Sequence, residues 1–278
     1  MEIGAIQLKT FFRRIFWIII QMIFLWVIAS SSWGMHESVD CTSCHSYLGD
    51  KITEYSNEDM HFSKSQICLS CHDAGMDLSG LNPPFVLNGS STLAGGSFTS
   101  TLFSDKTGHN IQSEDRVLGV TPPGGAPLTE LTCLSCHDPH NNGNYRNLKK
   151  EINGHPTPVK ALGDPNYQTN VYFSGMNEFC GACHFRFNGR ASAGGVGGRK
   201  RHPVGITVSR AEHADIEWWS GLENKVTRVE NPSGNPNDIY AARVFCLSCH
   251  RAHASPYENA LRWDYGKSPR GCLECHTF

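Results

Sequence analysis

The pattern Cys-x-x-Cys-His occurs six times in this chain of 278 residues and uses all twelve of its cysteines. The six copies are Cys41/Cys44/His45, Cys68/Cys71/His72, Cys133/Cys136/His137, Cys180/Cys183/His184, Cys246/Cys249/His250 and Cys272/Cys275/His276. This is the spacing of covalent c-type haem attachment. Two thiols three residues apart lie on one side of a helical turn and can both add to porphyrin vinyl groups, and the next histidine then faces the iron as its proximal ligand. We therefore expect six covalently attached haem c groups.

Zinc knuckles and a disulfide framework are the alternative interpretations of paired cysteines. Histidine makes up only 14 of the 278 residues, so its occurrence by chance after every one of the six pairs is negligible. The motifs also leave no cysteine for a disulfide, a free thiol or a separate metal centre. Both alternatives are therefore disfavoured.

Eight further histidines are candidates for the second axial position of each iron. They are His36, His61, His109, His140, His155, His202, His213 and His253. His140 and His253 each follow a proximal histidine by three positions. Such a residue is too close to its own haem's proximal ligand to reach the opposite face of that haem, so we expect it to bind the iron of a neighbouring haem.

Several stretches of the chain resemble the multihaem cytochromes that carry a doubled Cys-x-x-Cys-His motif. They are Thr107-Gly108-His109-Asn110, Leu134-Ser135-Cys136-His137-Asp138-Pro139-His140, Met176-Asn177-Glu178-Phe179-Cys180, Arg201-His202-Pro203-Val204 and Cys246-Leu247-Ser248-Cys249-His250-Arg251-Ala252-His253-Ala254-Ser255. The resemblance extends from about residue 36 to the end of the chain. It implies that His109, His140, His202 and His253 are distal ligands. His36 and His61, each a few residues before a motif, complete a set of six, with His155 and His213 as alternatives.

Residues 1–34 have the pattern of an export signal. A basic segment with Lys9, Arg13 and Arg14 precedes an apolar stretch over residues 15–29, and small residues follow, which predicts cleavage before Met35. A retained membrane anchor is the alternative, although the apolar stretch is short for one. Because haem is attached to these motifs outside the cytoplasmic membrane, we expect a periplasmic, outer-membrane-associated or extracellular protein.

Residues 35–278 would form one hexahaem module. With about 41 residues for each haem there is too little chain for an ordinary core, so the haems must supply much of it. We expect mostly irregular coil with short α-helices wrapped around six haems, little β-structure and an elongated shape. The 27 glycines and 14 prolines agree with this. Loss of Glu2, Lys9, Arg13 and Arg14 with the signal changes the formal charge from −2 to −4, which disfavours a nucleic-acid partner.

Two imidazoles on each iron would leave no coordination position for a substrate. The sequence thus predicts a cytochrome that relays electrons by outer-sphere transfer to redox partner proteins or an external acceptor, rather than an enzyme. Relatives in the doubled-motif family serve respiration on external acceptors, and some polymerise into conducting filaments. A filament protomer is therefore one alternative, and a multihaem reductase with one open haem is another. Every motif ends in histidine, without the Cys-x-x-Cys-Lys variant associated with a nitrite-reducing haem.

Overall fold

A computed structural model of the chain is described here for most residues between 36 and 276. The described residues are 36, 39–44, 64–74, 83–87, 93–98, 106–111, 121–128, 130–162, 171–188, 202–208, 228–235, 238 and 240–276. The predicted export signal and the candidate ligands His45, His61 and His213 lie outside these residues.

Regular secondary structure is sparse and short. The helices are α3 (Lys64–His72), α4 (Cys133–Cys136), α5 (Met176–Gly181), α6 (Cys246–Cys249) and α7 (Arg270–Leu273), with 3-10 turns η1 (Tyr145–Asn147), η2 (Phe185–Phe187) and η7 (Glu258–Ala260). Strand β1 (Glu151–Ile152) pairs antiparallel with β2 (His155–Pro156), and β3 (Lys160–Leu162) with β4 (Val171–Ser174). This confirms the prediction of a mostly irregular chain with short helices. No helix in the described ranges is long and apolar enough to cross a membrane.

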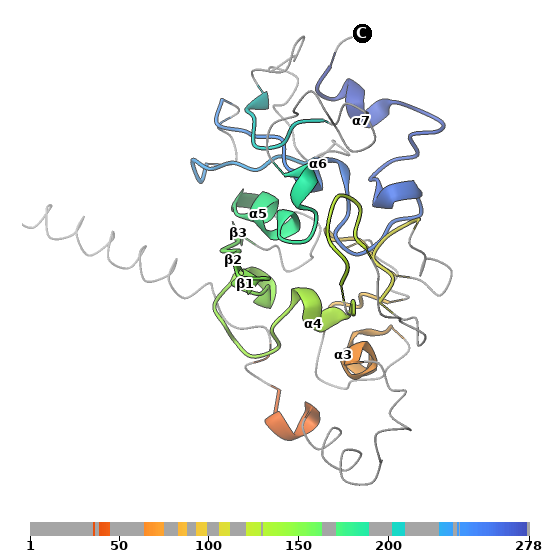
Figure 1. Cartoon of the computed structure of the whole chain (residues 1–278), viewed down its shortest axis with the longest axis vertical. Helices are drawn as coiled ribbons and strands as arrows, with labels where there is room; N and C mark the ends of the chain where they lie inside the picture. The colour runs from red at the N-terminus through yellow and green to blue at the C-terminus, as the bar shows by residue number, and fades with distance from the viewer. Residues whose placement is uncertain are drawn as a thin grey trace, which may run out of the picture.

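The haem motifs follow one another along the molecule in the order of the sequence. Cys41–Cys44 form a helical turn at one end of the longest axis, and α3, α4, the neighbouring α5 and α6, and finally α7 succeed it towards the other end (Figure 1). Helix α3 packs against α4, and α5 packs against α6. The side chains of Cys68 and Cys133 interact with each other, as do those of Cys180 and Cys246. The folded chain thus arranges its motifs as a linear series.

Two segments of the chain form copies of one structural unit. Helices α4 and α6 have the same sequence, Cys-Leu-Ser-Cys, and equivalent residues lie 113 positions apart, as at 133 and 246. In both copies the residue after the helix makes an isolated antiparallel bridge, His137 with Leu148 and His250 with Leu261.

The helices that pack on these two copies are also equivalent. The first amide of α4 donates to Ser65 Oγ at 3.2 Å, and the first amide of α6 donates to Asn177 Oδ1 at 3.0 Å. Ser65 and Asn177 each lie three residues before the first cysteine of their own motif. The unit therefore includes two consecutive haem motifs and occurs twice.

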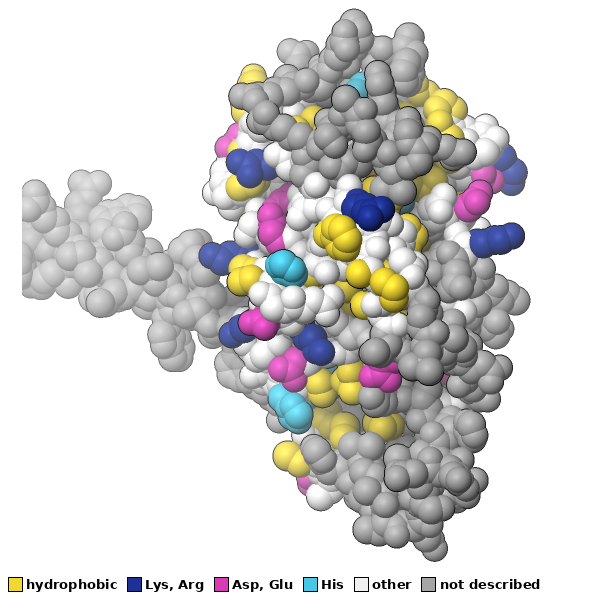
Figure 2. All heavy atoms as spheres, viewed as in Figure 1, with side chains coloured by type: hydrophobic (Ala, Val, Ile, Leu, Met, Phe, Trp, Pro, Cys, Tyr) yellow, Lys and Arg dark blue, Asp and Glu magenta, His cyan; other side chains and the backbone are white. Residues whose placement is uncertain are grey.

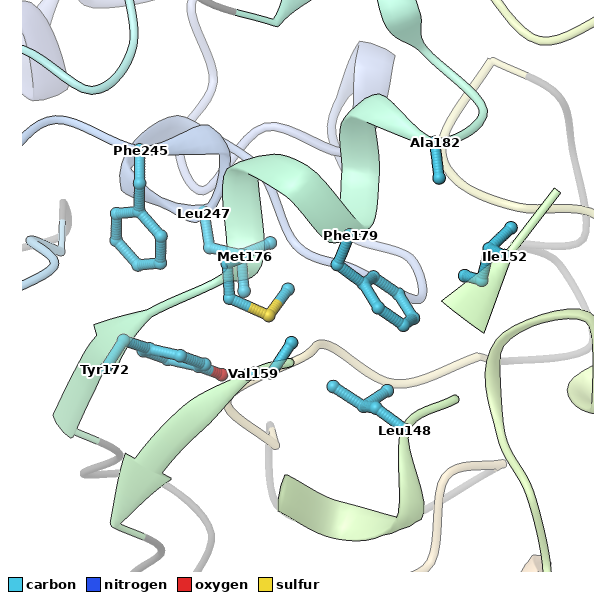
Figure 3. Close-up of a cluster of buried hydrophobic side chains, with 9 residues drawn as sticks. All are labelled: Leu148, Ile152, Val159, Tyr172, Met176, Phe179, Ala182, Phe245 and Leu247. Carbon is cyan, nitrogen blue, oxygen red and sulfur yellow. The ribbon is translucent and has the colours of Figure 1, made fainter. Parts of the chain in front are cut away.

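The hydrophobic core is divided into small clusters between the motifs. In the largest, Met176 of α5 lies near Val159 and near Tyr172 of β4, and Phe179 of α5 points towards Leu148 (Figure 3). Phe245 packs on Tyr172 with ring centroids 5.2 Å apart. A second cluster contains Leu69, Leu87, Phe98, Ile111 and Ala254, and a third contains Val208, Ala242 and Val244. The described core is therefore a set of small, separate clusters rather than one continuous core.

The long segment between the second and third motifs wraps around distant parts of the chain. The amide of Val86 donates to the His72 carbonyl at 2.9 Å, and the amide of His109 donates to the His253 carbonyl at 2.9 Å. Gly108 is required at the second contact because a Cβ there would lie 2.4 Å from the His253 carbonyl oxygen. This segment thus connects the second motif to the fifth.

Candidate haem-binding sites

The cysteines of the second motif show how a short helix presents its two attachment residues. Cys68 and Cys71 both lie on α3, one turn apart, and both are partly exposed. The hydroxyl oxygen of Ser70 lies 3.9 Å from Cys71 Sγ. All twelve cysteines are among the described residues, and no disulfide joins any of them there. Haem attachment at Cys71, as at each of the other eleven positions, stays a prediction for that residue.

The motif histidines that follow α4 and α6 are each oriented by the short turn that comes after them in the chain. After α4 the backbone becomes extended at His137, and its Nδ1 lies 3.1 Å from the carbonyl oxygen of Arg146. The equivalent distance from His250 Nδ1 to Asn259 O is 2.7 Å. Arg146 and Asn259 both have left-handed backbones, with φ of 50° and 58°. Such conformations are costly for residues other than glycine and are concentrated at functional sites, and here they direct a carbonyl group at the histidine.

The same type of hydrogen bond is made by eight histidines. Their Nδ1 atoms lie 2.6–3.1 Å from backbone carbonyl oxygens: His36 to Pro139, His72 to Pro84, His109 to Ala252, His137 to Arg146, His184 to Pro123, His202 to Pro203, His250 to Asn259 and His253 to Gly96. A carbonyl oxygen can only accept, so Nδ1 carries the proton and the Nε2 lone pair is available. This is the tautomer and orientation of a metal-binding imidazole.

Four proximal histidines face a second histidine from a distant part of the chain. The ring centroids are 6.1 Å apart for His36 and His72, 6.2 Å for His253 and His137, 6.0 Å for His109 and His184, and 6.0 Å for His202 and His276. Metal–imidazole bonds of about 2.0–2.1 Å, with each ring centre about 1.1 Å beyond its nitrogen, would separate two axial rings by about 6.2–6.4 Å. The observed separations therefore fit one iron between the rings of each pair.

Burial favours the uncharged forms of the side chains at these sites. It lowers the pKa of His253 to about 4, with a further contribution from His137, and it also lowers the pKa of His109. These imidazoles are neutral at pH 7, as iron ligation requires. Burial raises the pKa of the Cys136 and Cys249 thiols to about 12. Thioether bonds to haem carry no charge, so they suit these positions better than zinc thiolates do.

A small cavity of about 50 Å³ lies at the sixth motif. His202 and His276 both line it, as do the two cysteines of that motif, Cys272 and Cys275. Trp263 also lines the cavity, and it packs so closely on α7 that a Cβ at Gly271 would lie 2.4 Å from its ring. Both candidate axial ligands and both cysteines of the sixth motif therefore border one space.

The remaining histidine candidates are placed differently. His140 is exposed, with its Nδ1 3.4 Å from Asp138 Oδ1, so ligation by His140 stays a prediction. His155 is exposed on β2. Figure 2 shows acidic and basic side chains interspersed on one face of the described surface, with neither sign gathered into a large patch. Within the described ranges no three His, Cys, Asp or Glu side chains form a cage for a bare metal ion. A porphyrin-held iron needs only two axial protein ligands.

The groups that support these ligands were not evident from the sequence. His253 is an example, because its amide donates to Gly95 O at 2.6 Å, its Nδ1 to Gly96 O at 3.1 Å, and its ring stacks on Phe98 with centroids 5.3 Å apart. A Cβ at Gly96 would collide with the carbonyl of Ala254, 1.9 Å away. The adjacent glycines at 95 and 96 were the available signal, but their partner is set only by the fold.

Known proteins match this chain over most of its length. Residues 36–215 match the family model described as outer membrane cytochrome MtrC/MtrF-like, domains II/IV, and residues 240–278 match the doubled CXXCH motif. C-type cytochrome OmcS of Geobacter sulfurreducens is 22% identical over 327 residues, which cover 83% of this chain and 71% of OmcS.

Two filament structures of this Geobacter sulfurreducens cytochrome also match at 20% identity. One, of the outer membrane cytochrome S filament, has a TM-score of 0.48 and covers 72% of this chain and 74% of its own. The other, of OmcS nanowires, has a TM-score of 0.49 and covers 77% of this chain and 82% of its own.

Proposed function

Because the chain belongs to the family of MtrC/MtrF-like outer membrane cytochromes and binds haem c covalently, we propose that it is a hexahaem electron-transfer protein. In this proposal it relays electrons by outer-sphere transfer between redox partner proteins and an external acceptor. The observation that carries the proposal is the set of four opposed histidine pairs with ring centroids 6.0–6.2 Å apart.

The residues at each site bind and orient the cofactor and occupy its iron. Each haem, when bound, supplies a one-electron iron couple. The two cysteines of a motif would hold the macrocycle, and two histidines would bind its iron. The carbonyl acceptors at Nδ1 hold each ring in place and increase its basicity. With both axial positions filled, a substrate has no iron site to bind, which supports an electron carrier over a reductase.

The repeated unit supports an assignment for His140. In the second copy, His253 faces His137, the proximal histidine of the first copy. His140 is the equivalent of His253, so the same relation assigns it to the iron of His45, one unit earlier. The residues directly before His140 and His253 are also equivalent. The carbonyl of Pro139 accepts a hydrogen bond from His36, and the carbonyl of Ala252 accepts one from His109.

His61 is then assigned by elimination to the iron of His250, with His155 and His213 as alternatives. These assignments give six irons with two histidines each. The order of the motifs along the molecule supports a relay in chain order, from the haem at Cys41/Cys44 to the haem at Cys272/Cys275.

We further propose that residues 1–34 are an export signal and that residues 35–278 function outside the cytoplasmic membrane. The family's outer-membrane members support this location. N-terminal sequencing of the haem-loaded protein tests the cleavage site, and recovery of residues 1–34 on that protein would favour an anchor.

A homopolymer is a second candidate state. It is supported by the placement of the first and last motifs at opposite ends of the long axis (Figure 1), which would let electrons pass between copies joined end to end. Electron microscopy of the native material tests this state. Single particles without end-to-end contacts over a range of concentrations would exclude it.

Intact mass and electron paramagnetic resonance (EPR) test the main proposal together. We expect a native mass equal to the processed chain plus six haems, and only low-spin signals from the oxidised protein. A mass with five or fewer haems and free thiols would contradict the haem count. A high-spin signal equal to about one iron per chain, with stoichiometric binding of nitrite or carbon monoxide, would favour the reductase instead.

A further inference from the structure

Two arginines converge on one peptide segment beside the fifth motif. Arg262 is only 8% exposed, and its Nε donates to Leu247 O at 2.7 Å while its Nη2 lies 3.4 Å from Ala94 O. Arg251 reaches the same segment, with its Nη1 2.8 Å from Leu93 O and 3.4 Å from Ala94 O. The two guanidinium groups therefore share one carbonyl oxygen.

Neither arginine has a negatively charged partner in the described part of the chain. Among these residues, both arginine side chains donate only to neutral backbone carbonyl oxygens, and neither arginine forms an ion pair. Three donor nitrogens, Nη1 of Arg262 and Nε and Nη2 of Arg251, have no acceptor among those bonds. A carbonyl group cannot neutralise a cation, and an uncompensated buried charge is strongly destabilising. An anion beside these two adjacent cations would therefore stabilise this part of the fold.

The surroundings of the pair indicate which anion is available. Ala94 directly precedes Gly95 and Gly96, whose carbonyls bind His253, and the His253 ring faces His137 at 6.2 Å. The arginine contacts thus lie one residue from the support of an axial ligand. Every haem has two propionate groups, and arginine binds carboxylates in a bidentate manner.

We propose that Arg251 and Arg262 form a binding site for a propionate of the haem held between His137 and His253, and that they raise the reduction potential of that haem. This inference rests on the proposed haem ligation at that site. The physical reason for the higher potential is that nearby positive charge favours the iron form that has gained an electron, and it also neutralises the propionate, whose negative charge acts in the opposite direction.

The test compares haem-loaded variants by potentiometric titration followed by EPR and optical spectroscopy. Arg262→Gln, Arg251→Gln and the double variant should each lower one midpoint potential, with about a tenfold change in its redox equilibrium constant for the double variant, or about 59 mV for a one-electron couple. Arg262→Lys keeps the charge and should retain most of the potential. Lys160→Gln removes an exposed positive charge on β3, outside the haem motifs, and should shift no midpoint.

The shifted component is identified in a Cys133→Ser/Cys136→Ser background, which lacks the haem in question. The component should be absent there, and Arg262→Gln should have no further effect. Unchanged midpoints in variants that carry all their haems would overturn the arginine site, even if those variants were less stable. A change in midpoint potential that Arg262→Gln still causes in this background would overturn the proposed site, because the anion would then belong to another haem. A change that occurs only in assembled material would overturn it as well, because the anion would then come from another copy of the chain. A wild-type mass without the haem at Cys133/Cys136 would instead refute the underlying ligation.

Discussion

Replacement of His253 by alanine tests whether a distal ligand comes from a motif other than that of its own haem. The His253 ring lies 6.2 Å from that of His137, although His253 follows the fifth motif and His137 ends the third. His137 has its own hydrogen bond to Arg146 O and should stay in place. The iron at Cys133/Cys136 should therefore keep one imidazole and gain one open position, while the haem at Cys246/Cys249 keeps its ligands.

The expected magnitude follows from the contacts of His253. One iron per chain should become high-spin and bind one carbon monoxide molecule in the reduced state. The substitution also removes the hydrogen bond from His253 Nδ1 to Gly96 O at 3.1 Å and the stacking of the His253 ring on Phe98, whose centroids are 5.3 Å apart. With about 1 kcal/mol for the hydrogen bond, about 0.5–1.5 kcal/mol for the ring pair and a contribution from the cavity, the variant should lose about 2–4 kcal/mol of stability.

The assay combines carbon monoxide titration, EPR and thermal unfolding in two backgrounds. In the otherwise native protein, His253→Ala should create one new carbon monoxide site. In the Cys133→Ser/Cys136→Ser background the same substitution should create none, because the affected haem is absent. Glu151→Ala removes an exposed side chain on β1 that cannot be an axial ligand of a histidine pair, and it is the control. A new site that persists in the double-serine background, or destabilisation without any open site, would refute the proposed pairing.

Three further predictions concern other parts of the structure. His109→Ala should open the iron at Cys180/Cys183, because the His109 ring faces that of His184 at 6.0 Å, and carbon monoxide titration should detect one new site. Gly108→Ala should lower the free energy of unfolding, measured by denaturant titration, by about 1–3 kcal/mol, because the added Cβ collides with the His253 carbonyl. Gly266→Ala is the control and should change this free energy little, because its added Cβ would lie 3.4 Å from Asp264 Oδ1. Burial raises the pKa of the Glu230 carboxyl from 4.5 to about 7. Between these two pH values the folded state keeps a proton that the unfolded state releases, so the stability of the fold falls as the pH rises through this range. Glu230→Gln should therefore stabilise the protein by up to about 3 kcal/mol at pH 8 and leave it nearly unchanged at pH 4, as measured by denaturant unfolding at both values.

The sequence was most informative where the chemistry is local. Five adjacent residues specify haem attachment and the proximal ligand, so all six attachment sites could be predicted without a fold. The sparse secondary structure also followed, because there is too little chain per haem for an ordinary core. The repeat was visible as Cys-Leu-Ser-Cys-His at 133–137 and 246–250, but only the three-dimensional structure revealed that its two copies share turns, bridges and packing partners.

Which histidines face each other was decided by tertiary structure. Nothing in the sequence near His253 or His109 indicates that they face His137 and His184, since those pairings depend on the path of the wrapping segment between the second and third motifs. The same holds for the carbonyl acceptors at each Nδ1, because hydrogen bonds between distant segments form only when the whole chain is folded. The sequence by itself thus determined how haem is attached and which residues were available to bind iron. The tertiary structure decided which of them lie opposite one another, because axial geometry is a relation in space between segments far apart in the chain.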